Sequence, residues 1–213
     1  PTAIRFIIEG TGAYTAIDGE RVYMAPGDLI LTPSWAWHDH GNETKERVVW
    51  MDGLDIPLVA ALEAMFFQFY SSAQVPASRP ANSSEQMYGH AHITPTWVKE
   101  KPQSSPLLLY SWDQAWQALN SLRTHEGSAH DGVVLEYCHP QTGGPVLPTM
   151  GCMIQLLRPG EQGAVATSAW QQFKVDLSRW SVEQVIGAFG YATNDNANPG
   201  LPQVIYFDDI VWE

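Results

Sequence analysis

The first fifty residues of the chain consist of short β-prone runs separated by turn signals every few residues. The clearest turn is Asp18-Gly19, because both residues tolerate the positive φ of a two-residue hairpin. Pro26-Gly27-Asp28 marks a second turn between two further apolar runs. Runs this short and this closely spaced favour a β-meander that closes into a sandwich or barrel. The expected strands cover residues 4–8, 13–17, 22–24, 29–32 and 47–51.

After residue 56 the spacing of the apolar residues changes to that of a helix. Pro57 suits a first helical turn, and apolar residues then recur at helical spacing as far as Phe69. Residues 71–106 are rich in Ser, Pro, Ala and Gln, so we expect a long surface loop there. A second helix is expected to begin at Ser111, which can form a capping box with Gln114. The apolar positions of the two helices are Leu58, Leu62, Met65, Phe66 and Phe69, and Trp112, Ala115, Trp116, Leu119 and Leu122.

Strand-like sequence returns after Gly132. Residues 133–137 and 153–157 predict two strands on either side of a Gly143-Gly144-Pro145 turn. The last fifty residues also have β-like runs, ending with residues 204–210. The chain as a whole is therefore expected to be mainly β, with its helices confined to the middle.

The charge of the chain narrows the classes of partner. Eleven basic and 23 acidic residues give a formal charge of -12, which repels nucleic-acid phosphates and anionic lipid. No apolar run reaches the roughly 18 to 20 residues that a membrane span needs, and the N-terminus has no features of a signal peptide. Cys138 and Cys152 cannot build a disulfide framework. We expect a cytoplasmic protein that binds small molecules or proteins, and neither nucleic acid nor a membrane.

The densest chemical signal lies between Pro33 and Asn42. If this segment is extended, His38 and His40 share one face and Asp39 points to the other. Imidazole pairs of this kind suit zinc, copper, iron or nickel. The alternative is two histidines at a loop mouth that bond only water and backbone. A second His-x-His, His90-Ala91-His92, has polar surroundings that favour a mobile loop over a metal site.

Several short motifs together resemble one known family. They are Arg5 to Gly12, Asp18-Gly19-Glu20, Pro26-Gly27-Asp28, Thr32 to Trp35, Trp37 to Asn42, Trp50 to Pro57, Thr142 to Thr149 and Leu156 to Glu161. In these motifs the chain closely resembles the gentisate 1,2-dioxygenase family, bicupin ring-cleaving enzymes that include salicylate and 1-hydroxy-2-naphthoate dioxygenases. The resemblance implies a cupin, a double-stranded β-helix or jelly roll, here an incomplete bicupin with a helical linker.

The resemblance also implies a division of the chain. Residues 1–56 would be an N-terminal cupin lacking its first strands, and residues 57–130 a linker of helix and loop. Residues 131–161 would begin a second cupin. Residues 162–213 would be a β-rich tail of different character, since their sequence resembles the last strands of a jelly-roll carbohydrate-binding module.

The family's functional residues carry over to four positions. His38 is implied to be an iron ligand, with two further histidines expected just before Pro1, and His40 is implied to contact the substrate. Arg5 is implied to meet the substrate carboxylate, since a guanidinium holds an oxyanion in a fixed geometry. Asp52 is implied to orient one of the imidazoles. No other cofactor-binding residue is implied.

Two functions follow as hypotheses. The first is an Fe(II)-dependent dioxygenase that acts on gentisate or a related aromatic acid and adds O2 across the bond between the carboxyl- and hydroxyl-bearing ring carbons. Its full-length parent is expected to be a homo-oligomer. The second is a non-catalytic cupin remnant or carbohydrate-binding β-sandwich, in keeping with a single iron ligand and the character of the tail.

Overall fold

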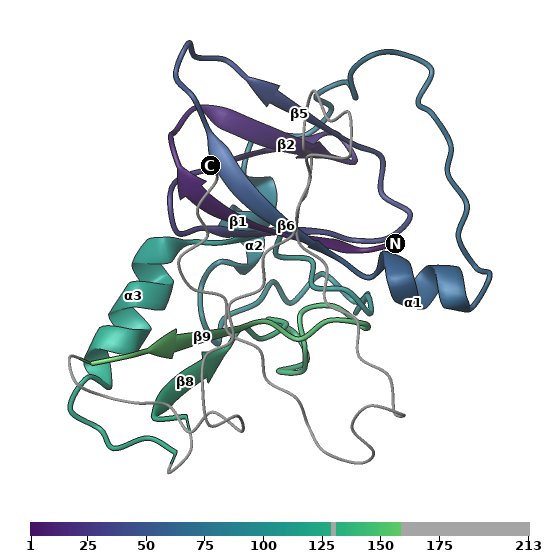
Figure 1. The fold of residues 1–213 in the computed structure, drawn as a ribbon. Coiled ribbons are helices and arrows are strands. Elements are labelled where there is room, and N and C mark those ends of the chain that lie inside the picture. The colour runs from purple at the N-terminus through teal and green to yellow at the C-terminus, as the bar shows by residue number, and fades with distance from the viewer. Residues whose placement is uncertain (129–130, 159–213) are drawn as a thin grey trace, which may run out of the picture.

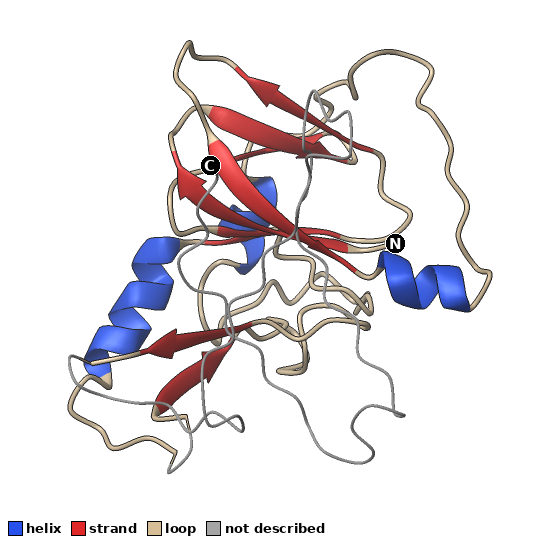
Figure 2. Cartoon of the chain, in the orientation of Figure 1, coloured by secondary structure: helices blue, strands red, loops and turns tan. Residues whose placement is uncertain are grey.

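A computed structural model describes residues 1–128 and 131–158 (Figure 1). Its elements are mostly short strands, as the turn signals predict (Figure 2). Along the sequence, the helices come after the sixth strand and before the eighth. The strands are β1 (Ala3–Glu9), β2 (Ala13–Ile17), β3 (Glu20–Tyr23), β4 (Leu29–Thr32), β5 (His38–Asn42), β6 (Val49–Leu54), β7 (Leu109–Tyr110), β8 (Val133–Glu136) and β9 (Met153–Leu156). The helices are α1 (Ile56–Ala61), α2 (Ser83–Tyr88) and α3 (Trp112–Ser121).

The strands form two facing antiparallel sheets and a separate hairpin. One sheet has the order β6-β1-β4-β7 and the other the order β3-β2-β5, while β8 pairs with β9. In Figure 1 the layer of β2 and β5 lies above that of β1 and β6, and the hairpin lies below both. The four-stranded sheet is therefore the middle layer, covered on both of its faces.

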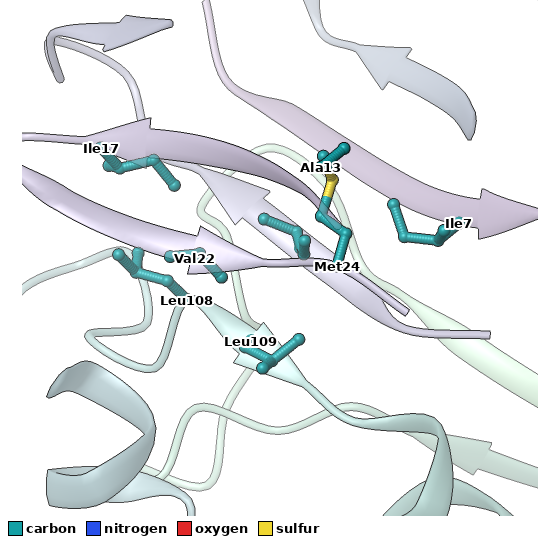
Figure 3. Packing of buried hydrophobic residues seen from close by; sticks show 8 residues of the cluster. Ile7, Ala13, Ile17, Val22, Met24, Leu108 and Leu109 are labelled. Carbon is teal, nitrogen blue, oxygen red and sulfur yellow. The ribbon is translucent and has the colours of Figure 1, made fainter. Parts of the chain in front are cut away.

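Side-chain alternation along the middle sheet separates two apolar clusters. Ile7 and Ile30 face the three-stranded sheet and join the main core, part of which is drawn in Figure 3. Leu29 and Leu31, the neighbours of Ile30 along β4, pack on the opposite face against Val146. Alternate residues of a strand point to opposite faces, so one run of four buried residues serves both clusters. The main cluster comprises Ile7, Ala13, Ile17, Val22, Met24, Ile30, Leu108 and Leu109.

Every residue of β2 is buried because the strand is also covered on both sides. Its inner face meets the middle sheet, and its outer face carries Tyr14 and Ala16, which pack against Val75. The backbone amide of Val75 donates to a carboxylate oxygen of Asp39, so the loop that contains Val75 is hydrogen-bonded to β5. The hairpin predicted at Asp18-Gly19 is confirmed, with φ values of 45° and 85°.

The helical expectations need two corrections. The helix predicted to run to Phe69 ends at Ala61, because Glu63 takes a left-handed φ of 52° and no residue of α1 is buried. The stretch of residues 71–106, expected to be a loop, contains α2. That short helix is held by the buried carboxylate of Glu20, which accepts from the Ser84 amide at 2.9 Å and the Ser84 hydroxyl at 2.6 Å.

α3 begins where the sequence predicts, after Ser111, but without the expected capping box. The Gln114 side chain donates instead to the Gly89 carbonyl oxygen at 3.0 Å. The strands expected near residues 133–137 and 153–157 are confirmed as β8 and β9. The tail proposed over residues 162–213 lies outside the described residues. Among residues 1–128 and 131–158, no helix combines the length and apolar character needed to cross a membrane.

A buried carboxylate ties the start of the chain to the segment before β9. Asp55 accepts from the Thr2 amide and the Thr2 hydroxyl, each at 2.7 Å, and from the Thr149 hydroxyl at 2.6 Å. Burial acts to raise the pKa of Asp55, but the hydrogen bonds from Thr149 and Thr2 outweigh it, so the pKa lies below its ordinary value. The charged form of Asp55 is therefore the one that stabilises the fold.

We expect Asp55→Asn to lower the free energy of unfolding at pH 7 by about 1.5 kcal/mol, because charge-assisted hydrogen bonds become neutral ones. A depressed carboxyl pKa gives stability that is present above the unfolded pKa and is lost as pH falls through the folded pKa. Urea unfolding at pH 7 and below pH 4 checks both effects: the gap between wild type and variant should narrow in acid. An equal gap at both pH values would contradict the assignment.

Candidate active site

Strand register brings the sequence-predicted residues of the two sheets together, with Arg5 buried and His38 and His40 exposed. Arg5 on β1 lies opposite Asp52 on β6, and Thr15 on β2 lies opposite His40 on β5. His38 and His40 share the inner face of β5, with ring centres 5.8 Å apart. Segments more than thirty residues apart thus contribute to one cluster.

Arg5 links the two sheets. Its side chain is only 4% exposed, and its Nε and Nη2 donate to the two carboxylate oxygens of Asp52, each at 2.7 Å. Its Nη1 reaches across to the other sheet, donating to Thr15 Oγ1 at 2.7 Å and to His40 Nδ1 at 2.8 Å. The guanidinium also lies over the ring of Trp50, 4.9 Å from its centre. Four of its five N–H groups are therefore used within the protein.

The contact with Arg5 decides the tautomer of His40. A guanidinium can only donate, so Nδ1 of His40 must accept and cannot carry a proton. The neutral ring then carries its proton on Nε2. His40 is thus a hydrogen-bond donor on the side of its ring away from Arg5, and its Nε2 has no free lone pair for a metal.

His38 has the opposite tautomer. Its Nδ1 lies 3.2 Å from the carbonyl oxygen of Ala36, which can only accept, so Nδ1 donates and Nε2 keeps its lone pair. A histidine whose second nitrogen is tied to a backbone carbonyl is the usual form of a metal ligand. Within the described part of the chain, no group of three His, Cys, Asp or Glu residues is arranged to hold a metal.

Both carboxylate oxygens of Asp52 accept from Arg5, so Asp52 is connected to His40 through that guanidinium. The role implied for Asp52, orienting an imidazole, stays a prediction. Trp50 Nε1 lies 3.4 Å from one of the same oxygens. His90 and His92 are exposed on their loop, as the sequence favours.

Thr15 is a site residue that sequence reasoning missed. A signal was available: Thr15 is the only polar residue among the alternate positions of β2 that face inward, between Ala13 and Ile17. Its importance depends on the register with β5, which the sequence does not reveal.

The environment of His40 keeps its ring neutral. Burial, the positive charge of Arg5 and the proximity of His38 lower the pKa of His40 from 6.5 to about 4, although the carboxylates of Asp52 and Asp39 act in the other direction. His40 as a residue is exposed, but its Nδ1 lies 2.8 Å from Nη1 of the buried guanidinium of Arg5.

We expect the His40 ring to stay neutral from pH 8 down to about pH 5, whereas a histidine in an unfolded chain gains its proton near 6.5. Between the folded pKa of about 4 and the unfolded pKa of 6.5, the unfolded state binds more protons than the folded state. The titration of His40 therefore lowers the free energy of unfolding as the pH falls through 6.5. Ring-nitrogen NMR across this range measures it, with His40→Gln to assign the signal. A titration midpoint above 6 would contradict the prediction.

Comparison with known proteins supports the fold. Residues 1–56 match the cupin domain family. The chain is 38% identical over 157 residues to gentisate 1,2-dioxygenase 1 of Aquipseudomonas alcaligenes, covering 73% of this chain and 45% of that enzyme. It is 40% identical over 164 residues to a 1-hydroxy-2-naphthoate 1,2-dioxygenase of Nocardioides sp. (strain KP7), covering 76% of this chain and 42% of that enzyme.

The solved structure of a salicylate 1,2-dioxygenase from Pseudaminobacter salicylatoxidans superposes with a TM-score of 0.63 at 34% identity, covering 71% of this chain and 45% of that one. Residues 1–56 thus have a cupin domain, and over about three quarters of its length the chain is similar to gentisate 1,2-dioxygenases and related ring-cleaving dioxygenases. The predicted fold class, a mainly β cupin, is thereby confirmed. The chain spans about half the length, or less, of the curated relatives it matches.

Proposed function

We propose that this chain belongs to an Fe(II)-dependent dioxygenase that opens the ring of gentisate or a related ortho-hydroxylated aromatic acid. The observation that carries the proposal is the pairing of a buried guanidinium, Arg5, with a neutral imidazole, His40, beside a second imidazole whose Nε2 is free. This combination suits an anion that must be held next to a metal ion. Relatives named for gentisate, hydroxynaphthoate and aminosalicylate support the substrate class.

A ferrous ion fits His38, since the hydrogen bond to Ala36 leaves its Nε2 as a neutral nitrogen donor. His40 does not fit as a ligand, because its Nε2 carries the proton. The proposal therefore places the remaining ligands outside the described residues. When bound, ferrous iron supplies coordination positions for the carboxylate and neighbouring hydroxyl of the substrate and for dioxygen.

The residues of this chain would hold the substrate anion. Arg5 has one N–H left, on Nη2, for a carboxylate oxygen, and His40 Nε2–H is a second donor directed away from Arg5. Asp52 keeps the guanidinium in place, and Trp50 covers its face. The reaction breaks the bond between the carboxyl-bearing and hydroxyl-bearing ring carbons, and both atoms of O2 enter the product, so it consumes no external reductant.

The test uses the complete product of the gene, loaded with Fe(II) under anaerobic conditions. Oxygen uptake is measured with gentisate, salicylate and 1-hydroxy-2-naphthoate, and ¹⁸O2 should add both labelled atoms to the product. 3-Hydroxybenzoate is the matched control, because its hydroxyl cannot chelate together with the carboxylate. A folded, iron-loaded protein that consumes no oxygen with any of the three acids would refute the proposal. Tight binding of gentisate without turnover would favour the non-catalytic alternative.

A further inference from the structure

Thr15 is a polar residue in a position that otherwise takes apolar ones. Its side chain is fully buried, at 0% exposure, and it points into the sandwich between the core residues Ala13 and Ile17. A buried hydroxyl costs stability unless it is hydrogen-bonded, so its partners explain why it is tolerated.

All the partners of the Thr15 hydroxyl belong to the inner face of the sandwich. Oγ1 accepts from Arg5 Nη1 at 2.7 Å, since the guanidinium can only donate. The hydroxyl hydrogen is then directed to His40 Nδ1, 3.2 Å away, or to the sulfur of Met24 at 3.9 Å. Thr15 therefore contacts both members of the Arg5–His40 hydrogen bond.

The two hydrogen bonds to Asp52 hold only the edge of the Arg5 guanidinium that is formed by Nε and Nη2. Asp52 is 24% exposed and can move with its own side chain, whereas Thr15 lies in the middle of a strand covered on both faces. Thr15 is thus the fixed anchor on the opposite edge, at the nitrogen that bonds His40.

We infer that Thr15 is a positioning residue, which holds Arg5 Nη1 against His40 Nδ1 and so keeps His40 in the tautomer with its proton on Nε2. The effect on turnover rests on the proposed function, because it supposes that Nε2–H donates to the substrate. The effect on the tautomer does not depend on that function and can be measured in the 213-residue chain itself.

Three variants separate this role from a general effect on packing. Thr15→Val removes the hydroxyl at nearly constant volume, and Thr15→Ser keeps the hydroxyl but removes the methyl group. Thr32→Val makes the same change at another buried threonine, on β4. Ring-nitrogen NMR at pH 7.5 should show only the Nε2–H form of His40 in wild type, Thr15→Ser and Thr32→Val. A second signal, from Nδ1–H, should be seen in Thr15→Val.

The Arg5 Nε–H resonance serves as an internal check, because its bond to Asp52 should survive in Thr15→Val. In the complete gene product, Thr15→Val should lower kcat/KM for gentisate by about 10- to 100-fold, whereas Thr15→Ser should stay within about threefold of wild type. A single unchanged tautomer in Thr15→Val, or equal effects of Ser and Val, would overturn the inference. If the wild-type gene product turns over none of the acids, the proposed function fails and the tautomer measurement still decides the role of Thr15.

Discussion

Replacing Arg5 with methionine is expected to lower the free energy of unfolding by about 3 kcal/mol, because it leaves the carboxylate of Asp52 half-buried without its partner. It also removes the hydrogen bonds that connect Arg5, on the four-stranded sheet, to Thr15 and His40 on the facing sheet. Urea unfolding followed by tryptophan fluorescence measures the loss. We expect the midpoint to fall by roughly 1 to 2 M.

Arg47 provides a matched control. Its ion pair with Glu9 has nearly the same length, 2.8 Å against 2.7 Å for Arg5 and Asp52, but its two side chains are 74% and 56% exposed. Exposed pairs contribute little, so Arg47→Met should lower the urea midpoint far less than Arg5→Met does. Equal losses for the two arginine variants would show that burial does not set the strength of the Arg5 pair.

A double variant tests the physical cause. If the cost of Arg5→Met comes from the unpaired carboxylate, then Arg5→Met combined with Asp52→Leu should regain at least half of the lost stability, since an apolar pair has no charge to desolvate. A double variant less stable than Arg5→Met would instead assign the loss to the packing and hydrogen bonds of the guanidinium with Thr15 and Trp50.

Local patterns in the sequence predicted those parts of the fold that depend on nearest neighbours. The Asp18-Gly19 hairpin needs two positive φ values in succession, and this dipeptide supplies them with little strain. The helix over Leu58 to Phe69 was predicted from equally good spacing, yet it ends at Ala61. Spacing gives a helix an apolar face, but only a tertiary partner buries that face, and α1 has no buried residue.

Phe66, which was expected on that helix, finds a partner elsewhere. It packs against Trp35 with ring centres 4.8 Å apart, and Tyr70, just beyond the expected helix, packs against Trp37 at 5.0 Å. Both tryptophans belong to the segment that leads into β5. The spacing of apolar residues within one helix cannot reveal contacts with such a distant part of the sequence.

In the candidate site, too, local patterns predicted some features, whereas tertiary contacts decided others. Alternation along a single strand sufficed to place His38 and His40 on one face. The role of Asp52 and the presence of Thr15 depended instead on which residues of separate strands lie opposite one another. The register of paired strands is set by the whole fold. Local patterns therefore identify His38 as a candidate metal ligand more readily than they identify the residues around His40.

The two histidines of β5 should have separable roles in the complete gene product. His38→Ala should lower iron affinity by at least about 100-fold, because it removes a nitrogen donor whose Nδ1 is already tied to Ala36. His40→Ala should leave iron affinity within about threefold of wild type, since Nε2 of His40 carries a proton and is not available to a metal. Iron content after gel filtration measures this difference without any assay of turnover.

The same pair of variants should differ in their kinetics once iron is restored. His40→Ala should retain iron yet lose about 100-fold in kcat/KM, because it removes a fixed donor to the substrate anion from a partly buried site. His40→Gln should recover part of this loss, since its amide N–H can donate while remaining uncharged. If His40→Ala lost iron as completely as His38→Ala, then His40 would be a ligand, and its tautomer could not be the one that the contact with Arg5 requires.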